Sequence, residues 1–191
     1  MDADGLILAC ATSAEASAAR RAGRDAALVG LRASRGVPEG RLVSFGLAGA
    51  LHDGLAVGEV LDATRVVDAT GAVLWEGGPL GAAGARGGTI LAADEVVDDP
   101  AERRRLHEAT GADAVDMESG PLARSGRLAG CLRAVSDTPD ATLGALAGVL
   151  HPDGRLSLAR LARALGSHPR ASRRAISQSR LALRRLQEAA A

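Results

Sequence analysis

Short apolar runs that end in polar residues constrain the fold of this chain more than any other feature. Two of them, Ala114-Val115 and Cys131 to Val135, lie between residues 111 and 140 on either side of a helical segment. Asp-Met-Glu follows the first run at 116–118, and Ser-Asp follows the second at 136–137. Groups at the carboxyl ends of adjacent strands in an α/β sheet face one crevice. This stretch therefore predicts an active site.

The same alternation of strands and helices extends over most of the chain. Strands are predicted over residues 5–11, 26–31, 41–45, 58–67, 72–75 and 89–93, and helices over residues 12–22, 100–109, 118–128, 141–150, 157–165 and 170–188. A Gly-rich turn is predicted at 46–51, and Ala-Thr-Gly at 69–71 indicates a hairpin. The alternation predicts an α/β protein with three layers, and the hairpin predicts a central mixed β-sheet. We interpret residues 1–191 as a single domain whose Arg-rich residues 141–191 form a helical C-terminal extension.

Charge is distributed unevenly along a chain whose net charge is zero. Residues 1–150 hold 14 Arg and 21 acidic residues, a balance of −7, whereas residues 151–191 hold 9 Arg and 2 acidic residues, a balance of +7. Every basic residue is Arg, which codon bias in a GC-rich genome explains, so we expect no nucleic-acid partner. Two interpretations of the basic C-terminal helices fit: a solvated face that pairs with the acidic body, or a peripheral contact with an anionic membrane.

Neither the cysteines nor the hydropathy pattern indicates a metal site, a disulfide or an export signal. Cys10 and Cys131 are isolated in apolar runs, which is typical of buried free thiols. The N-terminus lacks a basic region followed by a long apolar run. No stretch approaches the ~18 apolar residues of a spanning helix. These features predict a cytoplasmic protein without a metal site.

Four sequence blocks carry a family resemblance. They are Ser-Phe-Gly-Leu-Ala-Gly-Ala-Leu at 44–51, Val-Gly-Glu-Val at 57–60, Ala-Val-Asp-Met-Glu-Ser at 114–119 and Arg-Ala-Val-Ser-Asp-Thr-Pro-Asp at 133–140. In this order over residues 5–140, they resemble the purine nucleoside phosphorylase and nucleosidase superfamily. The C-terminal part, which includes Leu-His-Pro-Asp-Gly-Arg-Leu at 150–156, is more loosely similar to the hopanoid-associated phosphorylase branch.

The resemblance implies the phosphorylase/hydrolase-like fold, assembly as a homodimer or higher homo-oligomer, and cleavage of the N-glycosidic bond of a purine nucleoside. On the sugar side, it implies that Glu118 accepts hydrogen bonds from the ribose hydroxyls and that Met117 packs on the sugar. It also implies that Glu15 positions the attacking water in a hydrolytic member. The residues that would line the nucleophile side of the sugar are Gly46, Ala48 and Gly49.

On the base side, the resemblance implies that Asp137 donates a proton or a hydrogen bond to N7 of the departing purine and that Ser136 orients Asp137. Val96 stands where the family carries an aromatic residue that stacks on the base. Each acidic residue also has a purely structural interpretation. Asp137 would be a turn residue at a strand end, whereas Glu15 and Glu118 would be first-turn helix residues that the helix dipole favours.

Two carboxyl groups with different roles suit this chemistry. Breaking a glycosidic bond builds positive charge on the sugar and negative charge on the base, and glycoside hydrolases divide acid and nucleophile-side roles between two carboxyl groups. For Asp137 to act as an acid near neutral pH, burial or a nearby carboxylate must raise its pKa.

The nucleophile and the substrate have alternatives. Phosphate would be a co-substrate of a phosphorylase, with Arg86 as a candidate ligand, and no other cofactor is expected. Glu15 favours water because a carboxylate repels an anion. The substrate is either an adenosyl-hopanoid lipid that releases adenine or a soluble nucleoside such as methylthioadenosine, S-adenosylhomocysteine or inosine. The third alternative is a non-catalytic nucleoside-binding protein, which the missing aromatic at Val96 favours.

Overall fold

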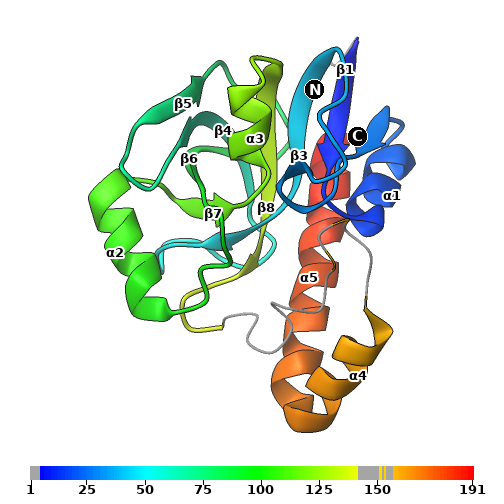
Figure 1. Ribbon diagram of the computed structural model, residues 1–191, viewed down its shortest axis with the longest axis vertical. Helices are drawn as coiled ribbons and strands as arrows, with labels where there is room; N and C mark the ends of the chain where they lie inside the picture. The colour runs from blue at the N-terminus through cyan, green and yellow to red at the C-terminus, as the bar shows by residue number, and fades with distance from the viewer. Residues whose placement is uncertain (1–4, 142–150, 152, 154–156) are drawn as a thin grey trace.

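The computed structural model describes residues 5–141, 151, 153 and 157–191 (Figure 1). Its strands are β1 Leu6–Cys10, β2 Ala26–Leu28, β3 Arg41–Ala50, β4 Val60–Val67, β5 Val73–Glu76, β6 Arg86–Ala92, β7 Ala114–Asp116 and β8 Leu128–Asp137. Its helices are α1 Ser13–Arg21, α2 Pro100–Thr110, α3 Ser119–Arg124, α4 Leu158–Ser167 and α5 Pro169–Ala190, with a 3₁₀ turn at Leu31–Ala33. The helix predicted over residues 141–150 lies outside the described residues, except for Ala141.

The strands form one mixed sheet around β3. β3 pairs in parallel with β1 and β8 and antiparallel with β7. β8 pairs antiparallel with β4, while β4 and β7 each pair in parallel with β6. These pairings return to β3, so β3, β8, β4, β6 and β7 close into a ring, and β2 and β5 are the edge strands. The predicted mixed sheet and the predicted β4–β5 hairpin are confirmed.

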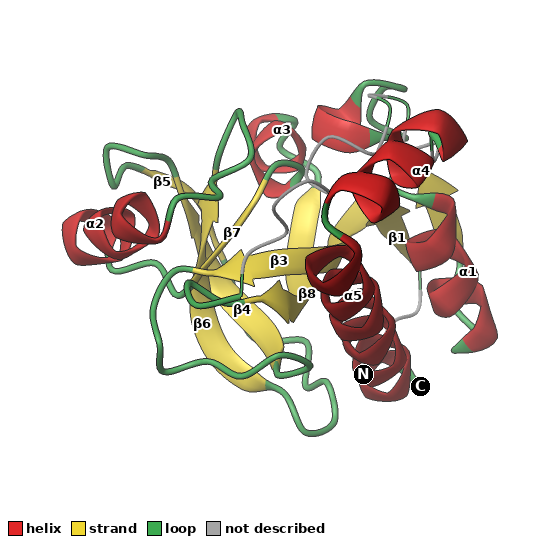
Figure 2. Cartoon of the chain, turned by 90° about the horizontal axis from the view of Figure 1, so that it is seen from below, coloured by secondary structure: helices red, strands yellow, loops and turns green. Residues whose placement is uncertain are grey.

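Helices cover both faces of this sheet (Figure 2). α1 and α5 pack with β1, β3 and β8 in one cluster, which includes Leu8, Phe45 and Leu186. α3 packs on the other face through Leu122, together with Ile90 and other residues of β3, β4 and β6. The cores are built almost entirely from aliphatic side chains, as a chain with two aromatic residues requires. This arrangement confirms the predicted α/β class.

Local sequence signals explain where the two helices at the site begin. Thr12 caps α1 in a reciprocal capping box with Glu15, so the carboxylate of Glu15 is held at the helix N-terminus. Asp99 caps α2, Pro100 occupies its first turn, and Gly111 ends it in the left-handed conformation. Among the described residues, none of the helices has the length and apolar character needed to cross a membrane.

The predicted Gly-rich turn at 46–51 is wrong, because residues 46–50 continue β3. Neither Gly46 nor Gly49 has a positive φ. A Cβ at Gly46 would lie 2.5 Å from both Glu15 Oε1 and Arg133 Nη1. These glycines therefore allow large polar side chains to approach the strand closely, rather than allowing the chain to turn.

Candidate active site

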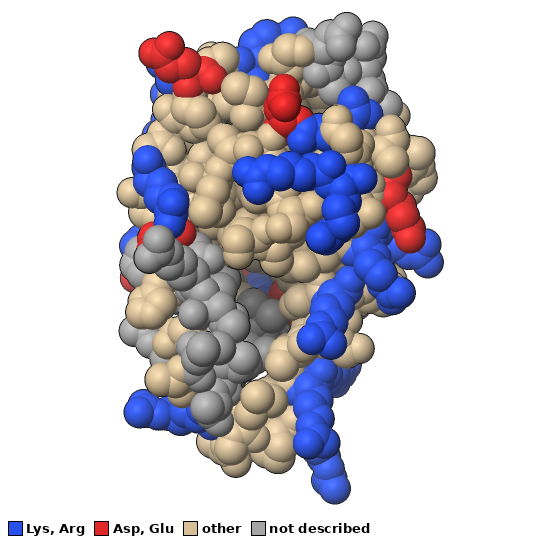
Figure 3. Space-filling view, turned by 90° about the vertical axis from the view of Figure 1, so that its right-hand side faces the viewer, with Lys and Arg blue, Asp and Glu red and all other residues tan. Residues whose placement is uncertain are grey.

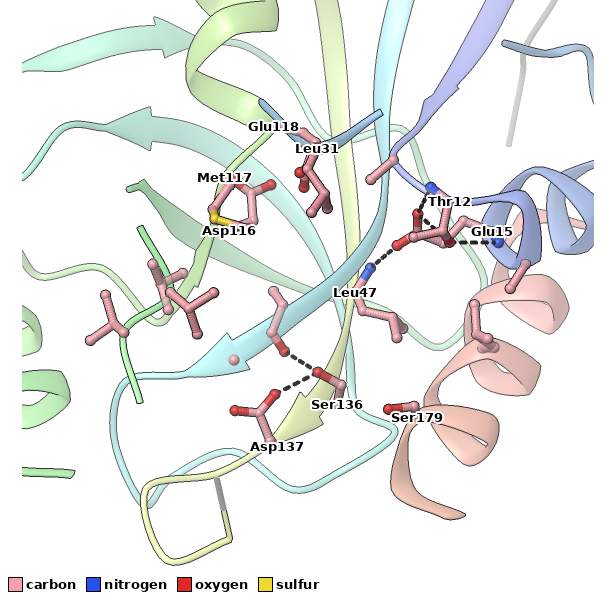
Figure 4. A pocket seen from close by; sticks show the side chains of 18 of the residues that line it. Thr12, Glu15, Leu31, Leu47, Asp116, Met117, Glu118, Ser136, Asp137 and Ser179 are labelled. Atoms are coloured by element: carbon pink, nitrogen blue, oxygen red, sulfur yellow. Dashed lines mark hydrogen bonds between the residues drawn. The ribbon is translucent and has the colours of Figure 1, made fainter. Parts of the chain in front are cut away.

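A cavity of about 570 Å³ lies where the ends of β1, β6, β7 and β8 meet the C-terminal part of β3 and one side of α5 (Figure 4). It brings together eight of the nine residues predicted to bind a nucleoside or act on it. Those that line it are Glu15, Ala48, Gly49, Val96, Met117, Glu118, Ser136 and Asp137. Gly46 is the exception, and its lack of a side chain makes room for Glu15 behind the cavity wall.

Arg133 of β8 stands at the centre of the acidic half of the site. It is fully buried and forms ion pairs with Asp116 and Glu118, the second at 3.8 Å between Nη1 and Oε2. Its guanidinium also donates to Ser44 Oγ at 2.5 Å. Burial opposes the charge of Arg133, but Asp116 and the neighbouring acids outweigh it and raise the pKa of the guanidinium. The role of Arg133 was not predicted, although a single Arg inside an apolar strand was a signal, and Asp116 was predicted to lie at the site without a role of its own.

Glu118 is a buried carboxyl whose protonation is finely balanced. Burial raises the pKa of Glu118 to about 8, and the charges of Asp116 and Glu15 add to that effect. Arg133 and a 3.2 Å hydrogen bond from the Arg32 backbone N–H oppose it. A carboxyl that titrates near neutral pH can both accept and donate hydrogen bonds, which suits a pair of sugar hydroxyls.

Glu15 links helix α1 to strand β3. Its Oε2 accepts from the Thr12 backbone N–H at 2.8 Å and from Thr12 Oγ1 at 2.9 Å. Its Oε1 accepts from the backbone N–H of Leu47 at 3.0 Å. Glu15 therefore has both the structural role of a capping residue and a fixed place on the cavity wall, where Figure 4 shows it hydrogen-bonded to Thr12 and Leu47.

Asp137 is held by two donors at the end of β8. Ser136 Oγ donates to Asp137 Oδ1 at 2.6 Å, and Arg103 of α2 forms an ion pair with Oδ2. Burial raises the pKa of Asp137, while Arg103 and the hydrogen bond from Ser136 oppose the rise. A Cβ at Gly49 would lie 3.0 Å from Asp137 Oδ2 and 3.1 Å from Arg103 Nη2, so a glycine there leaves room for the pair.

Arg103 is a second residue that sequence analysis missed. It lies in a run of three arginines, of which Arg104 and Arg105 are partly exposed and Arg103 is 1% exposed. Its Nε donates to the Val97 carbonyl at 2.8 Å and its Nη1 to the Ala50 carbonyl at 3.2 Å. Only the position three residues before the buried Leu106 distinguished it in the sequence.

The remaining walls of the cavity are largely apolar. Val96, which is 41% exposed, and Val97 line one side. The other side belongs to α5 through Ile176, Ser179, Arg180 and Leu183. The seven-residue spacing of Ile176 and Leu183 placed them on one helix face, but the sequence did not indicate that this face meets the site.

The predicted phosphate ligand does not reach the cavity. Arg86 begins β6, is exposed, and pairs with Glu59 at 3.1 Å. Neither residue lines the cavity, so Arg86 lies apart from the other residues predicted for the site. The arginines of the described lining are Arg103, which is committed to Asp137, and Arg180.

Gly46→Ala is expected to lower the free energy of unfolding by about 1–3 kcal/mol, because the new methyl group would displace the buried Glu15 and Arg133 side chains. Urea denaturation monitored by circular dichroism measures the effect. Gly87→Ala is the matched control, because Gly87 also lies in a strand, β6, and a Cβ there would meet nothing within 4 Å. Equal midpoints for the two variants would contradict the close approach at Gly46.

Comparison with known proteins places this geometry in context. A sequence profile described as Phosphorylase superfamily matches residues 79–165. A comparison with curated protein sequences found no significant match. Among solved structures, 5′-methylthioadenosine/S-adenosylhomocysteine nucleosidase from Helicobacter pylori is similar with a TM-score of 0.56 and 16% identity, over 69% of this chain and 84% of that chain.

Two further structures extend the likeness. The corresponding nucleosidase from S. pneumoniae has a TM-score of 0.54 and 15% identity, over 96% of this chain and 98% of that chain. A futalosine hydrolase mutant from Helicobacter pylori has a TM-score of 0.53 and 15% identity, over 69% of this chain and 89% of that chain. The chain therefore has the fold of these nucleosidases and hydrolases, and its residues 79–165 match the phosphorylase superfamily.

Proposed function

We propose that this protein cleaves the N-glycosidic bond of a purine nucleoside by hydrolysis. The observation that carries the proposal is one cavity in which the buried Asp137 faces a second set of buried acids, Glu15 and Glu118, on other strands and helices. The fold is that of nucleosidases, and part of the chain matches the phosphorylase superfamily.

The sugar half of the proposed site is formed by Glu118 and Met117. Glu118, with a pKa of about 8, is suited to hydrogen bonds with two adjacent hydroxyls of ribose. Met117 supplies an adaptable apolar surface for the sugar ring. Arg133 pairs with Asp116 and Glu118 and so partly neutralises the negative charge that these acids place beside the sugar, where positive charge develops.

The base half is formed by Asp137, with Ser136 and Arg103 as positioning residues. Because burial raises the pKa of Asp137, the carboxyl can hold a proton and give it to N7 of the purine as the C1′–N9 bond breaks. The electrons of that bond stay on the base, which the proton neutralises. Ser136 orients one carboxyl oxygen of Asp137, and Arg103 orients the other.

Water rather than phosphate is the proposed nucleophile. Glu15 lines the cavity and accepts a hydrogen bond from Leu47 of β3. A water bound to its carboxylate would therefore be next to Ala48 and Gly49 of the same strand. The oxygen of water bonds to C1′ and its proton goes to Glu15 or on to solvent. Buried carboxylates on this side of the cavity repel a phosphate anion.

The proposed substrate carries an apolar group. Leu31, Leu47, Ile176 and Leu183 give the cavity an apolar side that such a group would contact. An adenosyl lipid of the hopanoid type, which would release adenine, fits this wall. A soluble nucleoside with a small apolar substituent, such as 5′-methylthioadenosine, is the alternative. Val96, which offers no ring for base stacking, favours a binding protein without turnover as a second function.

Release of free base from a panel of nucleosides tests the proposal. Adenosine, 5′-methylthioadenosine, S-adenosylhomocysteine, inosine and an adenosyl lipid are each incubated with the protein, with and without phosphate. We expect adenine release that does not require phosphate and that is fastest with an apolar 5′-substituent. Release only with phosphate would make the protein a phosphorylase. Binding without release from any substrate would instead support the binding function.

A further inference from the structure

We propose that the exposed face of helix α5 docks the protein on an anionic lipid surface. The helix carries six arginines and one acidic residue, Glu188. Four of the arginines, at spacings of three, seven and four residues, fall on one side of the helix and are all exposed. This arginine stripe consists of Arg170, Arg173, Arg180 and Arg184.

The stripe lies directly beside the cavity. α5 packs into the core on one side through Ala175, Ala182 and Leu186, and it lines the cavity on the next side through Ile176 and Leu183. The arginine stripe borders this second side, and its member Arg180 is itself part of the cavity lining. Figure 3 shows basic side chains in a column along the edge of a hollow on this face of the molecule.

Basic residues of the neighbouring helix extend the positive surface. α1 packs against α5, where Arg21 Nε donates to Gln187 Oε1 at 3.0 Å and Arg24 Nε donates to the Ala190 carbonyl at 2.7 Å. Arg20 and Arg21 are exposed beside them. Around the column in Figure 3, acidic side chains are few. The described arginines of α1 and α5 therefore stand among few acidic side chains on this face.

A lipid surface fits the stripe better than a nucleic acid does. The stripe runs from Arg170 to Arg184, and at 1.5 Å per residue it extends over about 21 Å along one side of the helix, which suits contact with a plane. Single-stranded nucleic acids need exposed aromatic side chains for base stacking, but Phe45 is fully buried in the core and Trp75 lies in the edge strand β5. Ile176 and Leu183, which line the cavity next to the stripe, would contact a lipid-like molecule as it passes from the lipid surface into the cavity.

The proposal concerns docking alone and does not depend on the reaction proposed above. Co-sedimentation of the full chain with vesicles of phosphatidylglycerol and phosphatidylcholine, and with vesicles of phosphatidylcholine alone, measures it. We expect binding to the anionic vesicles that high salt abolishes, because the attraction is screened. Each basic residue near an anionic surface contributes roughly fivefold to partitioning.

The triple variant Arg170→Gln, Arg173→Gln and Arg184→Gln is therefore expected to bind on the order of 100-fold more weakly. Gln has a helix propensity close to that of Arg, so α5 should be retained, and circular dichroism checks this. Arg180 is left in place because it lines the cavity. The control changes the exposed Arg41, Arg65 and Arg124 to Gln, which removes the same charge from β3, β4 and α3.

Three outcomes would overturn the proposal. The first is no binding to anionic vesicles at low salt. The second is an equal loss of binding in the control variant, which would indicate attraction by total charge. The third concerns polyuridylic acid. If it displaced the protein from anionic vesicles, and if the triple variant no longer bound polyuridylic acid, a nucleic acid would be the ligand of the arginine stripe.

Discussion

Asp137→Asn is expected to lower kcat for base release by about 10²–10⁴-fold, the usual loss when a general acid is removed. Asn keeps the size of the side chain and can still contact N7 of the purine, but it has no acidic proton. Substrate affinity should therefore change much less than kcat. Single-turnover measurement of adenine release, together with equilibrium dialysis of the substrate, separates the two effects.

Asp140→Asn is the matched control for this variant. Asp140 lies three residues further along the chain, its side chain is 81% exposed, and it pairs with the exposed Arg104. Its replacement should leave kcat unchanged. If Asp137→Asn folded and released base at the wild-type rate, Asp137 would be a strand-end residue and the proton would come from elsewhere.

Arg103 gives the same assignment a test in pH. If the protonated form of Asp137 is active, kcat/KM falls as the pH rises through the pKa of Asp137. Arg103 holds that pKa down, so Arg103→Gln should move the fall to higher pH, whereas Arg103→Lys, which keeps the charge, should move it less. A fall at the same pH in both variants would mean that a different group controls activity.

The sequence predicted which residues share one cavity better than it predicted the path of the chain. Residues at the ends of β7 and β8 meet in one cavity because the strands that carry them belong to one sheet. That much follows from apolar runs that end in Asp, Glu or Ser. The position of Glu15 could be predicted for the same reason, because a capping residue at the start of α1 also lies just after the end of β1.

The parts that the sequence did not predict depend on long-range contacts. Gly46 and Gly49 resembled turn residues, yet they serve the approach of Arg133 and Arg103 from β8 and α2. Closure of the sheet through β8, which pairs with both β3 and β4, leaves no local pattern in the chain. The contribution of α5 to the cavity was hidden for a similar reason, because an amphipathic helix does not reveal what its apolar side covers.

Arg133→Met is expected to lower the free energy of unfolding by about 3–5 kcal/mol, the usual loss when one partner of a buried ion pair is removed. Met has a similar length, so little volume is lost, but the buried carboxyl groups of Asp116 and Glu118 lose their guanidinium partner. Urea denaturation near pH 8 measures the loss. Arg65→Met is the control, because Arg65 is an exposed strand residue whose replacement should change stability by no more than about 0.5 kcal/mol.

The pH dependence of this loss distinguishes charge from packing. Without Arg133, the pKa of Glu118 in the folded state should rise above its present value of about 8, further from its value of about 4.3 in the unfolded chain. Because the folded state then binds more protons than the unfolded state between these values, stability falls as the pH rises. The difference between Arg133→Met and wild type should therefore widen as the pH is raised from about 7 towards about 10, because Glu118 of wild type loses its proton with a pKa of about 8 whereas Glu118 of the variant keeps its proton to higher pH. A difference that stayed constant over this range would mean that Arg133 stabilises the fold through its packing and that its positive charge is not needed beside Asp116 and Glu118.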